Sequence, residues 1–183
     1  WDCTLEAEPG LTLTEIFAEA HRGQIKALYL IGENPVLADA DARRAREALE
    51  KLEFLVVQDV FLSETARLAH VVLPATTFAE KDGTFTNTER LVQRVRRAIE
   101  PIGDAKPDWW ITGQIAQRMG GKGFDFTNPS AIMDEISRLT PSYGGISYER
   151  LEDGGLNWPC PTPQHPGTPV LHTGRFTRGR GRF

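Results

Sequence analysis

The sequence predicts an α/β domain of three-layer, Rossmann-like form, in which a parallel sheet is covered by helices. Three short apolar runs alternate with segments of helical periodicity along the first half of the chain. Each run is uninterrupted and ends in polar residues, as expected for a strand that is buried on both faces. Strands separated by one helix pair in parallel through right-handed connections.

The first half of the chain supplies two predicted helices and two strands. Residues 13–20 carry apolar residues at helical spacing behind a cap at Thr12, and residues 27–31 form the first strand. Residues 39–52 are rich in Ala, Arg, Glu and Leu and present one apolar stripe, which predicts a helix. The second strand, residues 54–57, begins 27 residues after the first, the spacing of one strand-helix-strand unit.

The remaining elements follow from the same periodicities. A short helix over residues 63–69 leads to a third strand over 71–73, and residues 83–95 are expected to form an irregular hairpin. Helices are predicted over 108–119, where Pro107 suits a helix start, and over 129–139.

The 183 residues suffice for one well-buried domain. We expect residues 1–145 to form this domain and 146–183 to form an extended, loosely packed tail rich in Gly and Pro that leads into a further domain. Because the chain begins Trp1-Asp2-Cys3 without an initiator methionine or a signal sequence, it is expected to be a piece of a larger gene product.

Composition and charge exclude several classes of function. The net charge of −4 gives no reason to expect a nucleic acid partner, and no apolar run approaches the roughly 20 residues that span a bilayer. Cys3 and Cys160 lie at opposite ends of the chain, and two free thiols are favoured over a disulfide. Without a CxxC pattern or paired histidines, we expect no catalytic residue and no metal ligand within the chain.

Polar residues follow each predicted strand, at the edge where an open parallel sheet binds its ligand. Asn34 follows the first strand, Gln58 and Asp59 the second, and Lys81 comes after the third. The alternative is that these residues only form turns and cap helices, which is the default role of Asp108 at its helix start.

The common nucleotide signatures, GxGxxG and GxxxxGK[ST], are absent. A dinucleotide site of another kind remains open, because the carboxylate of Asp59 can accept hydrogen bonds from N1 and N2 of a guanine. Lys81 can balance the charge of a phosphate.

Four segments in register carry a resemblance to a known family. They are Leu30-Ile31-Gly32-Glu33-Asn34-Pro35, Val56-Val57-Gln58-Asp59-Val60-Phe61, Val71-Val72-Leu73-Pro74, and the run Glu80-Lys81-Asp82-Gly83-Thr84-Phe85-Thr86-Asn87-Thr88-Glu89-Arg90. Together with the Lys106-Pro107-Asp108-Trp109 helix start, they resemble the molybdopterin oxidoreductase family. Within it, the chain from about residue 12 onward is similar to the catalytic alpha subunit of formate dehydrogenase.

The resemblance implies a molybdenum or tungsten ion held by two molybdopterin guanine dinucleotides, of which this chain contacts one. The positions that it assigns to the dinucleotide are Asn34, Gln58, Asp59, Lys81 and Asp108. The metal-binding cysteine or selenocysteine of the family and the cysteines of its iron–sulfur clusters are not matched here. The isolated piece is therefore expected to be catalytically inert, and its cofactor binding is expected to be weak or absent.

The parent enzyme implied by the resemblance oxidises formate to carbon dioxide in the cytoplasm. Its partners would be the remaining domains of the same subunit and electron-transfer subunits, with no nucleic acid and no membrane contact by this piece. Nitrate reductase and the non-catalytic iron–sulfur subunit of respiratory NADH dehydrogenase share such domains and stay open as alternatives. An unrelated nucleotide-binding or interaction module is the third alternative.

Overall fold

The computed structural model describes residues 4–180 and divides them into two compact units. The first unit comprises the chain up to residue 80 together with residues 99–120, and the second comprises residues 81–98 and the chain from 121 onward. This division differs from the expected boundary at residue 145. The physical reason is that the 83–95 hairpin packs on the later part of the chain and shares a hydrophobic core with it.

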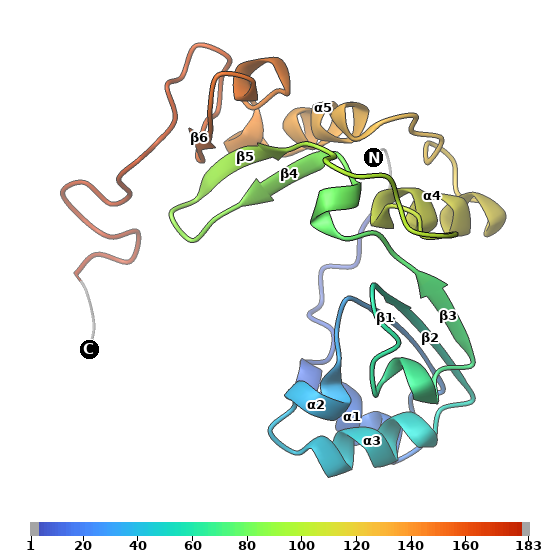
Figure 1. Cartoon of the computed structure of the whole chain (residues 1–183). Helices are drawn as coiled ribbons and strands as arrows, with labels where there is room; N and C mark the ends of the chain where they lie inside the picture. Colours follow the sequence, from blue (N-terminus) through green and yellow to red (C-terminus); the bar gives the residue numbers. More distant parts are fainter. Residues whose placement is uncertain (1–3, 181–183) are drawn as a thin grey trace. The chain divides into compact units, whose positions relative to one another are not determined.

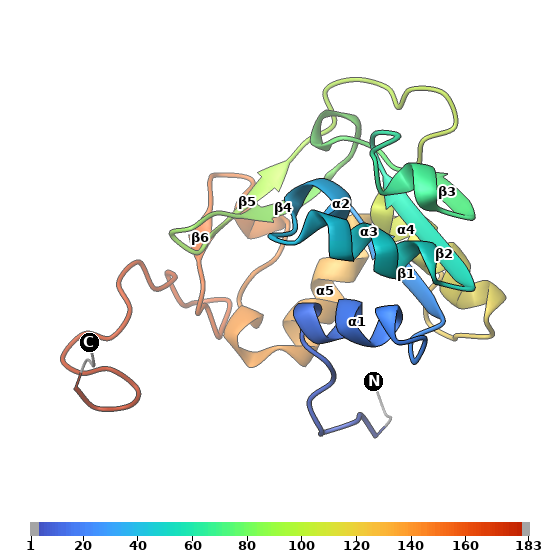
Figure 2. The same ribbon diagram turned by 90° about the horizontal axis from the view of Figure 1, so that it is seen from below.

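A three-stranded parallel sheet forms the centre of the first unit, as the sequence predicted. Its strands, in sheet order, are β1 (Ala27–Ile31), β2 (Phe54–Asp59) and β3 (Val71–Pro74). Ile31 lies opposite Gln58, and Asp59 lies opposite Pro74. The carboxyl ends of the three strands therefore meet side by side at one edge of the sheet (Figure 2).

Two helices cover one face of this sheet. They are α1 (Leu13–His21) and α3 (Ala42–Glu50), which lie next to each other beneath the strands in Figure 1. The fully buried residues that they share with the sheet are Phe17, Ala20, Ala45, Ala48, Leu49, Leu52, Leu55, Val57 and Ala66. As predicted, Thr12 caps α1, and its backbone N–H donates to Oε2 of Glu15 at 2.7 Å.

The helix predicted over residues 39–52 is shorter in the structure, and a second helix precedes it. Residues 35–38 form a separate short helix, α2 (Pro35–Ala38), and α3 begins only after Asp41. Asp41 acts as the cap because its carboxylate accepts from the backbone N–H of Arg44 at 3.1 Å. Likewise, the helix predicted over 63–69 is only a single 3₁₀ turn, η1 (Ala66–Leu68).

The opposite face of the sheet is only partly covered. The helix α4 (Asp108–Arg118) lies on this side (Figure 1), where its first turn meets Gln58 of β2. The large side chains left exposed on this face of the strands are those of Tyr29, Ile31, Phe54 and Val71. The expectation that every strand is buried on both faces is therefore wrong for this side of the sheet.

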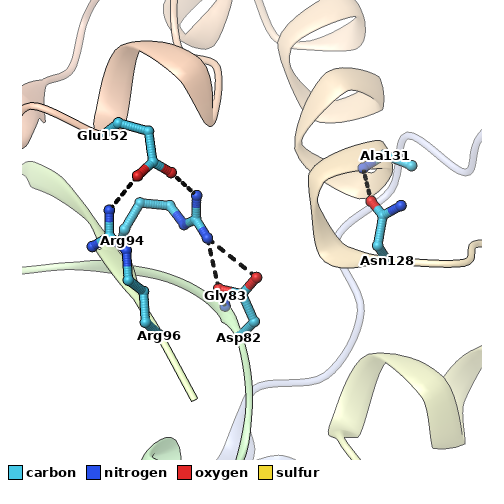
Figure 3. A network of polar contacts seen from close by, with 7 residues as sticks. All are labelled: Asp82, Gly83, Arg94, Arg96, Asn128, Ala131 and Glu152. Carbon is cyan, nitrogen blue, oxygen red and sulfur yellow. Dashed lines mark hydrogen bonds and ion pairs between the residues drawn. The ribbon is translucent and has the colours of Figure 1, made fainter. Parts of the chain in front are cut away.

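The second unit is built on an antiparallel sheet and one longer helix. Its strands, in sheet order, are β4 (Gly83–Thr86), β5 (Leu91–Val95) and β6 (Leu156–Asn157). The predicted hairpin is thus confirmed as β4 and β5. The helix α5 (Pro129–Leu139) has its predicted bounds, and Asn128 caps it by accepting from the N–H of Ala131 at 2.9 Å (Figure 3). Single 3₁₀ turns complete the elements: η2 (Phe78–Glu80), η3 (Pro141–Tyr143) and η4 (Glu149–Leu151), of which η2 belongs to the first unit.

A charged network joins the β4–β5 hairpin to η4 in the second unit (Figure 3). The guanidinium of Arg94, whose side chain is only 10% exposed, donates to both carboxylate oxygens of Asp82 at 2.8 and 3.1 Å and also binds Glu152. Arg96 binds the second oxygen of Glu152 at 2.5 Å. The ring of Tyr148 lies 4.0 Å from the Arg94 guanidinium. The buried arginine therefore has charged partners and an aromatic one.

The C-terminal segment is packed more closely than the sequence suggested. Cys160 is completely buried as a free thiol, and Leu151 is buried beside it. The guanidinium of Arg90 donates to the carbonyls of Thr168 and Pro169 at 2.9 and 3.0 Å, which fixes this part of the tail. The tail is therefore anchored at Leu151, Cys160 and residues 168–169, while residues 161–164 between these anchors are exposed. Cys3 and the final Arg182 and Phe183 lie outside the described residues.

Candidate functional site

Four chain segments meet at the carboxyl edge of the parallel sheet, and their backbones are hydrogen-bonded in sequence across it. Gly32 N–H donates to the carbonyl of Gln58 at 2.8 Å, and Ala75 N–H donates to that of Asp59 at 3.0 Å. Lys106 N–H donates to the carbonyl of Pro74 at 3.1 Å, and this fourth segment leads directly into α4. The edge therefore brings the residues after β1, β2 and β3 together with Asp108.

Gln58 and Asp108 contact each other directly, although 50 residues separate them in the chain. Nε2 of Gln58 donates to Oδ1 of Asp108 at 2.7 Å, and Oε1 of Gln58 accepts from the hydroxyl of Tyr29. Gln58 is 0% exposed, so both ends of its amide are used within the protein. Its position in this structure makes it a support for Asp108.

The carboxylate of Asp59 organises the loop that follows β2. Oδ1 accepts from the backbone N–H groups of Val60 and Phe61 at 2.6 and 3.2 Å, and Oδ2 accepts from the hydroxyl of Ser63 at 3.3 Å. These bonds are those of a turn-forming aspartate, which is the alternative role that the sequence left open. A carboxylate has about four lone-pair sites, so the turn and a ligand can share it.

Asn34 joins the loop after β1 to the loop after β2. Its Oδ1 accepts from the hydroxyl and the N–H of Thr65 at 2.7 and 3.2 Å, and its Nδ2 donates to Oε2 of Glu64 at 2.8 Å. The hydrogen bond from Asn34 is the largest cause of a lowered pKa for the Glu64 carboxyl. Asn34 thus fixes the relative positions of two of the loops that form the edge.

Lys81 belongs to the second unit and lies in the sequence between two anchored acids. Glu80, in the first unit, is 4% exposed, and its carboxylate accepts from the N–H groups of Thr77 and Ile102 at 2.8 and 2.7 Å. These hydrogen bonds lower the pKa of Glu80, although burial acts in the opposite direction, and the bond from Thr77 has the largest effect. Asp82 is held by Arg94, as described above.

Tyr29 was not assigned to this site from the sequence. It stands in the middle of an apolar strand and was expected to contribute only to the core. Burial raises the pKa of its phenol, a hydrogen bond with Thr112 acts in the opposite direction, and the charge of Asp108 adds to the rise. The available signal was the two-residue periodicity of β1. Tyr29 lies on the same face of the sheet as Ile31, and Ile31 is paired with Gln58 on the neighbouring strand, so all three side chains share that face.

Two further observations concern metals and membranes. Within residues 4–180, no three His, Cys, Asp or Glu side chains lie close enough together to hold a metal ion. In the same part of the chain, no helix combines the length and the apolarity needed to cross a bilayer.

Comparison with known proteins identifies the family. The family model described as molybdopterin oxidoreductase matches residues 3–118. The chain is 52% identical over 182 residues to the F420-dependent formate dehydrogenase 2 subunit alpha of Methanococcus maripaludis, covering 98% of this chain and 27% of that protein. It is 48% identical over 183 residues to the F420-dependent formate dehydrogenase subunit alpha of Methanocaldococcus jannaschii, covering 100% and 27%. A putative formate dehydrogenase of Staphylococcus haemolyticus is 48% identical over 179 residues, covering 97% and 18%.

A solved structure shares the fold. Acetylene hydratase from Pelobacter acetylenicus superposes with a TM-score of 0.64 at 22% identity, over 78% of this chain and 20% of that one. The chain spans only about a quarter of the methanogen subunits that it matches. The family match covers most of the first unit, including Asn34, Gln58, Asp59 and Asp108, and rules out an unrelated nucleotide-binding module. The chain belongs to the molybdopterin oxidoreductase family.

Proposed function

We propose that this chain is the part of a formate dehydrogenase catalytic subunit that binds one molybdopterin guanine dinucleotide. The observation that carries the proposal is the meeting of Asp108, Gln58 and Asp59 at the carboxyl edge of the parallel sheet. Ligands of open α/β sheets bind at this edge. The names of the relatives support formate as the substrate over the nitrate reductase and NADH dehydrogenase alternatives.

The residues at the edge fit the chemistry of a guanine dinucleotide. The two carboxylates, Asp59 and Asp108, are acceptors for the N1 and N2 hydrogens of guanine or for ribose hydroxyls. For Lys81, which belongs to the second unit, the family resemblance alone supports a role as a cation for the pyrophosphate. Phe61, two residues after Asp59 and 75% exposed, adds an apolar surface for a planar ring.

Within the proposed enzyme, these residues position the organic part of the cofactor. When bound, the molybdenum or tungsten pterin supplies the two-electron chemistry that converts formate to carbon dioxide and a proton. Asn34 keeps the two loops of the edge in place, and Asp59 orders the turn that carries Phe61. We propose that the piece alone is catalytically inert and that its role is to hold the dinucleotide together with the remaining domains of its subunit. Those domains and electron-transfer subunits are its proposed partners, in a cytoplasmic enzyme.

The test replaces Asp59 in the full-length protein. Asp59→Asn keeps an acceptor for the N–H groups of Val60 and Phe61 but turns an amide donor toward the ligand, so the fold is retained and the dinucleotide is lost. Asp59→Ala removes both functions. Asp41→Asn is the matched control, because asparagine caps a helix as well as aspartate does.

The readouts are the metal content by mass spectrometry, the GMP released by hydrolysis of the cofactor, and formate oxidation, with circular dichroism as the check on folding. The proposal predicts loss of metal, GMP and activity in both Asp59 variants and none of these losses in the control. Normal metal and GMP content in Asp59→Asn would reject the role of Asp59.

A further inference from the structure

A continuous chain of side-chain hydrogen bonds leads from the edge strand β1 through β2 to Asp108. The hydroxyl of Tyr29 on β1 donates to Oε1 of Gln58 on β2, and Nε2 of Gln58 donates to Oδ1 of Asp108 at 2.7 Å. All three residues belong to the first unit. The chain therefore connects two neighbouring strands to the first turn of α4.

The two partners of Gln58 favour the same orientation of its amide. A hydroxyl that donates must face Oε1, and an ionised carboxylate must face Nε2, because it can only accept. The reversed amide would direct its oxygen at the Asp108 carboxylate. Because Gln58 is 0% exposed, water cannot replace either partner without opening the structure.

Tyr29 also contacts α4 by a second route. Its phenol forms a hydrogen bond with Thr112, which lies four residues after Asp108 and therefore on the same face of the helix. Tyr29 and Gln58 together thus fix one face of the first two turns of α4 against the sheet. These contacts hold the Asp108 carboxylate in a fixed direction relative to the sheet.

We propose that Tyr29 is a positioning residue of the dinucleotide site, which acts through Gln58 to aim the Asp108 carboxylate at the hydrogen-bond donors of the ligand. The inference rests on the proposed function, in which Asp108 contacts the dinucleotide. A carboxylate binds the N–H donors of guanine or the hydroxyls of ribose, and it repels phosphate. Tyr29 itself touches no ligand in this arrangement.

The experiment is a double-mutant cycle between Tyr29→Phe and Asp108→Asn in the cofactor-free, full-length protein. The affinity for GDP, which serves as the probe, is measured by calorimetric titration. The same titration with ADP distinguishes binding of the guanine base from binding of the ribose. Tyr29→Phe keeps the ring and removes only the hydroxyl. Tyr143→Phe is the matched control. The ring of Tyr143 is stacked on Trp158 and packs against the core of the second unit, whereas Asp108 belongs to the first unit.

The inference predicts that Asp108→Asn weakens GDP binding by about tenfold or more and that Tyr29→Phe weakens it by about fivefold in the wild-type background. In the Asp108→Asn background, Tyr29→Phe changes the affinity by less than about twofold. If Asp108 binds the guanine base, ADP binding changes little in either variant; if it binds the ribose, GDP and ADP change together. Both patterns support the inference.

Three outcomes overturn it. Equal effects of Tyr29→Phe in both backgrounds would show that Tyr29 does not act through Asp108. An effect of Asp108→Asn with none of Tyr29→Phe would reject the positioning role and leave the proposed function intact. If Asp108→Asn changes neither nucleotide affinity, the assignment of Asp108 fails and the positioning role fails with it.

Discussion

Replacing Gln58 by glutamate tests the Gln58–Asp108 contact on which the site is built. In the wild type, Nε2 donates to the Asp108 carboxylate at 2.7 Å, so Gln58→Glu puts a second carboxylate at a fully buried position, next to the partly buried carboxylate of Asp108. Two like charges about 4 Å apart repel by about 4 kcal/mol at an effective dielectric constant of about 20. Domain stability is roughly 5–15 kcal/mol, so the loss is a large fraction of it.

The assay is urea denaturation of the chain at several pH values, with Gln58→Leu as the control that removes the amide without adding charge. The control loses roughly 2 kcal/mol, because the hydrogen bonds disappear but no charge is buried. Repulsion raises the folded-state pKa of the introduced carboxyl above its unfolded value of about 4.3. The stability of Gln58→Glu is therefore retained below this value and lost as the pH rises through the raised folded-state pKa. Equal stability of the two variants at neutral pH, with no difference in pH dependence, would refute the contact.

Two further predictions concern the supports on either side of Lys81. Arg94→Met lowers the free energy of unfolding of the second unit by roughly 2 kcal/mol, because it removes the buried guanidinium and leaves the carboxylates of Asp82 and Glu152 without this partner. Arg96→Met has a much smaller effect, because the side chain of Arg96 is 54% exposed. Chemical denaturation of the two variants checks this, and equal losses would contradict the central role of Arg94. The lowered pKa of Glu80 means that its carboxylate stabilises the fold above the unfolded pKa of about 4.3 and that this contribution is lost as the pH falls through the folded-state value. Glu80→Gln should therefore flatten the acid limb of the stability curve between roughly pH 5 and 3, and an unchanged limb would reject this.

The parallel sheet was predictable because its strands carry the signal within themselves. Three uninterrupted apolar runs separated by helical segments predict that β1, β2 and β3 run parallel, whereas their order in the sheet is known only from the structure. The polar residues after β1 and β2 could be assigned to one edge for the same reason. What no local pattern contains is the pairing of Lys106 with Pro74, which brings Asp108 to that edge from a segment 32 residues further along the chain.

The contributions of single side chains were less predictable. Tyr29 fits an apolar strand as well as any aromatic residue, and its hydroxyl has a role only because Gln58 and α4 are brought beside it. The packing of the Gly- and Pro-rich tail was missed because Arg90, 78 residues before Thr168, holds it through backbone carbonyls. Such contacts depend on tertiary structure, and composition carries no trace of them.

The measurement that tests the central claim most directly is a structure of the full-length protein with its pterin cofactor bound. We expect a guanine dinucleotide at the carboxyl ends of β1, β2 and β3, with Asp59 and Asp108 within hydrogen-bonding distance of its guanine or ribose. A dinucleotide bound at the opposite ends of these strands, or held by other domains without contact to either carboxylate, would contradict it.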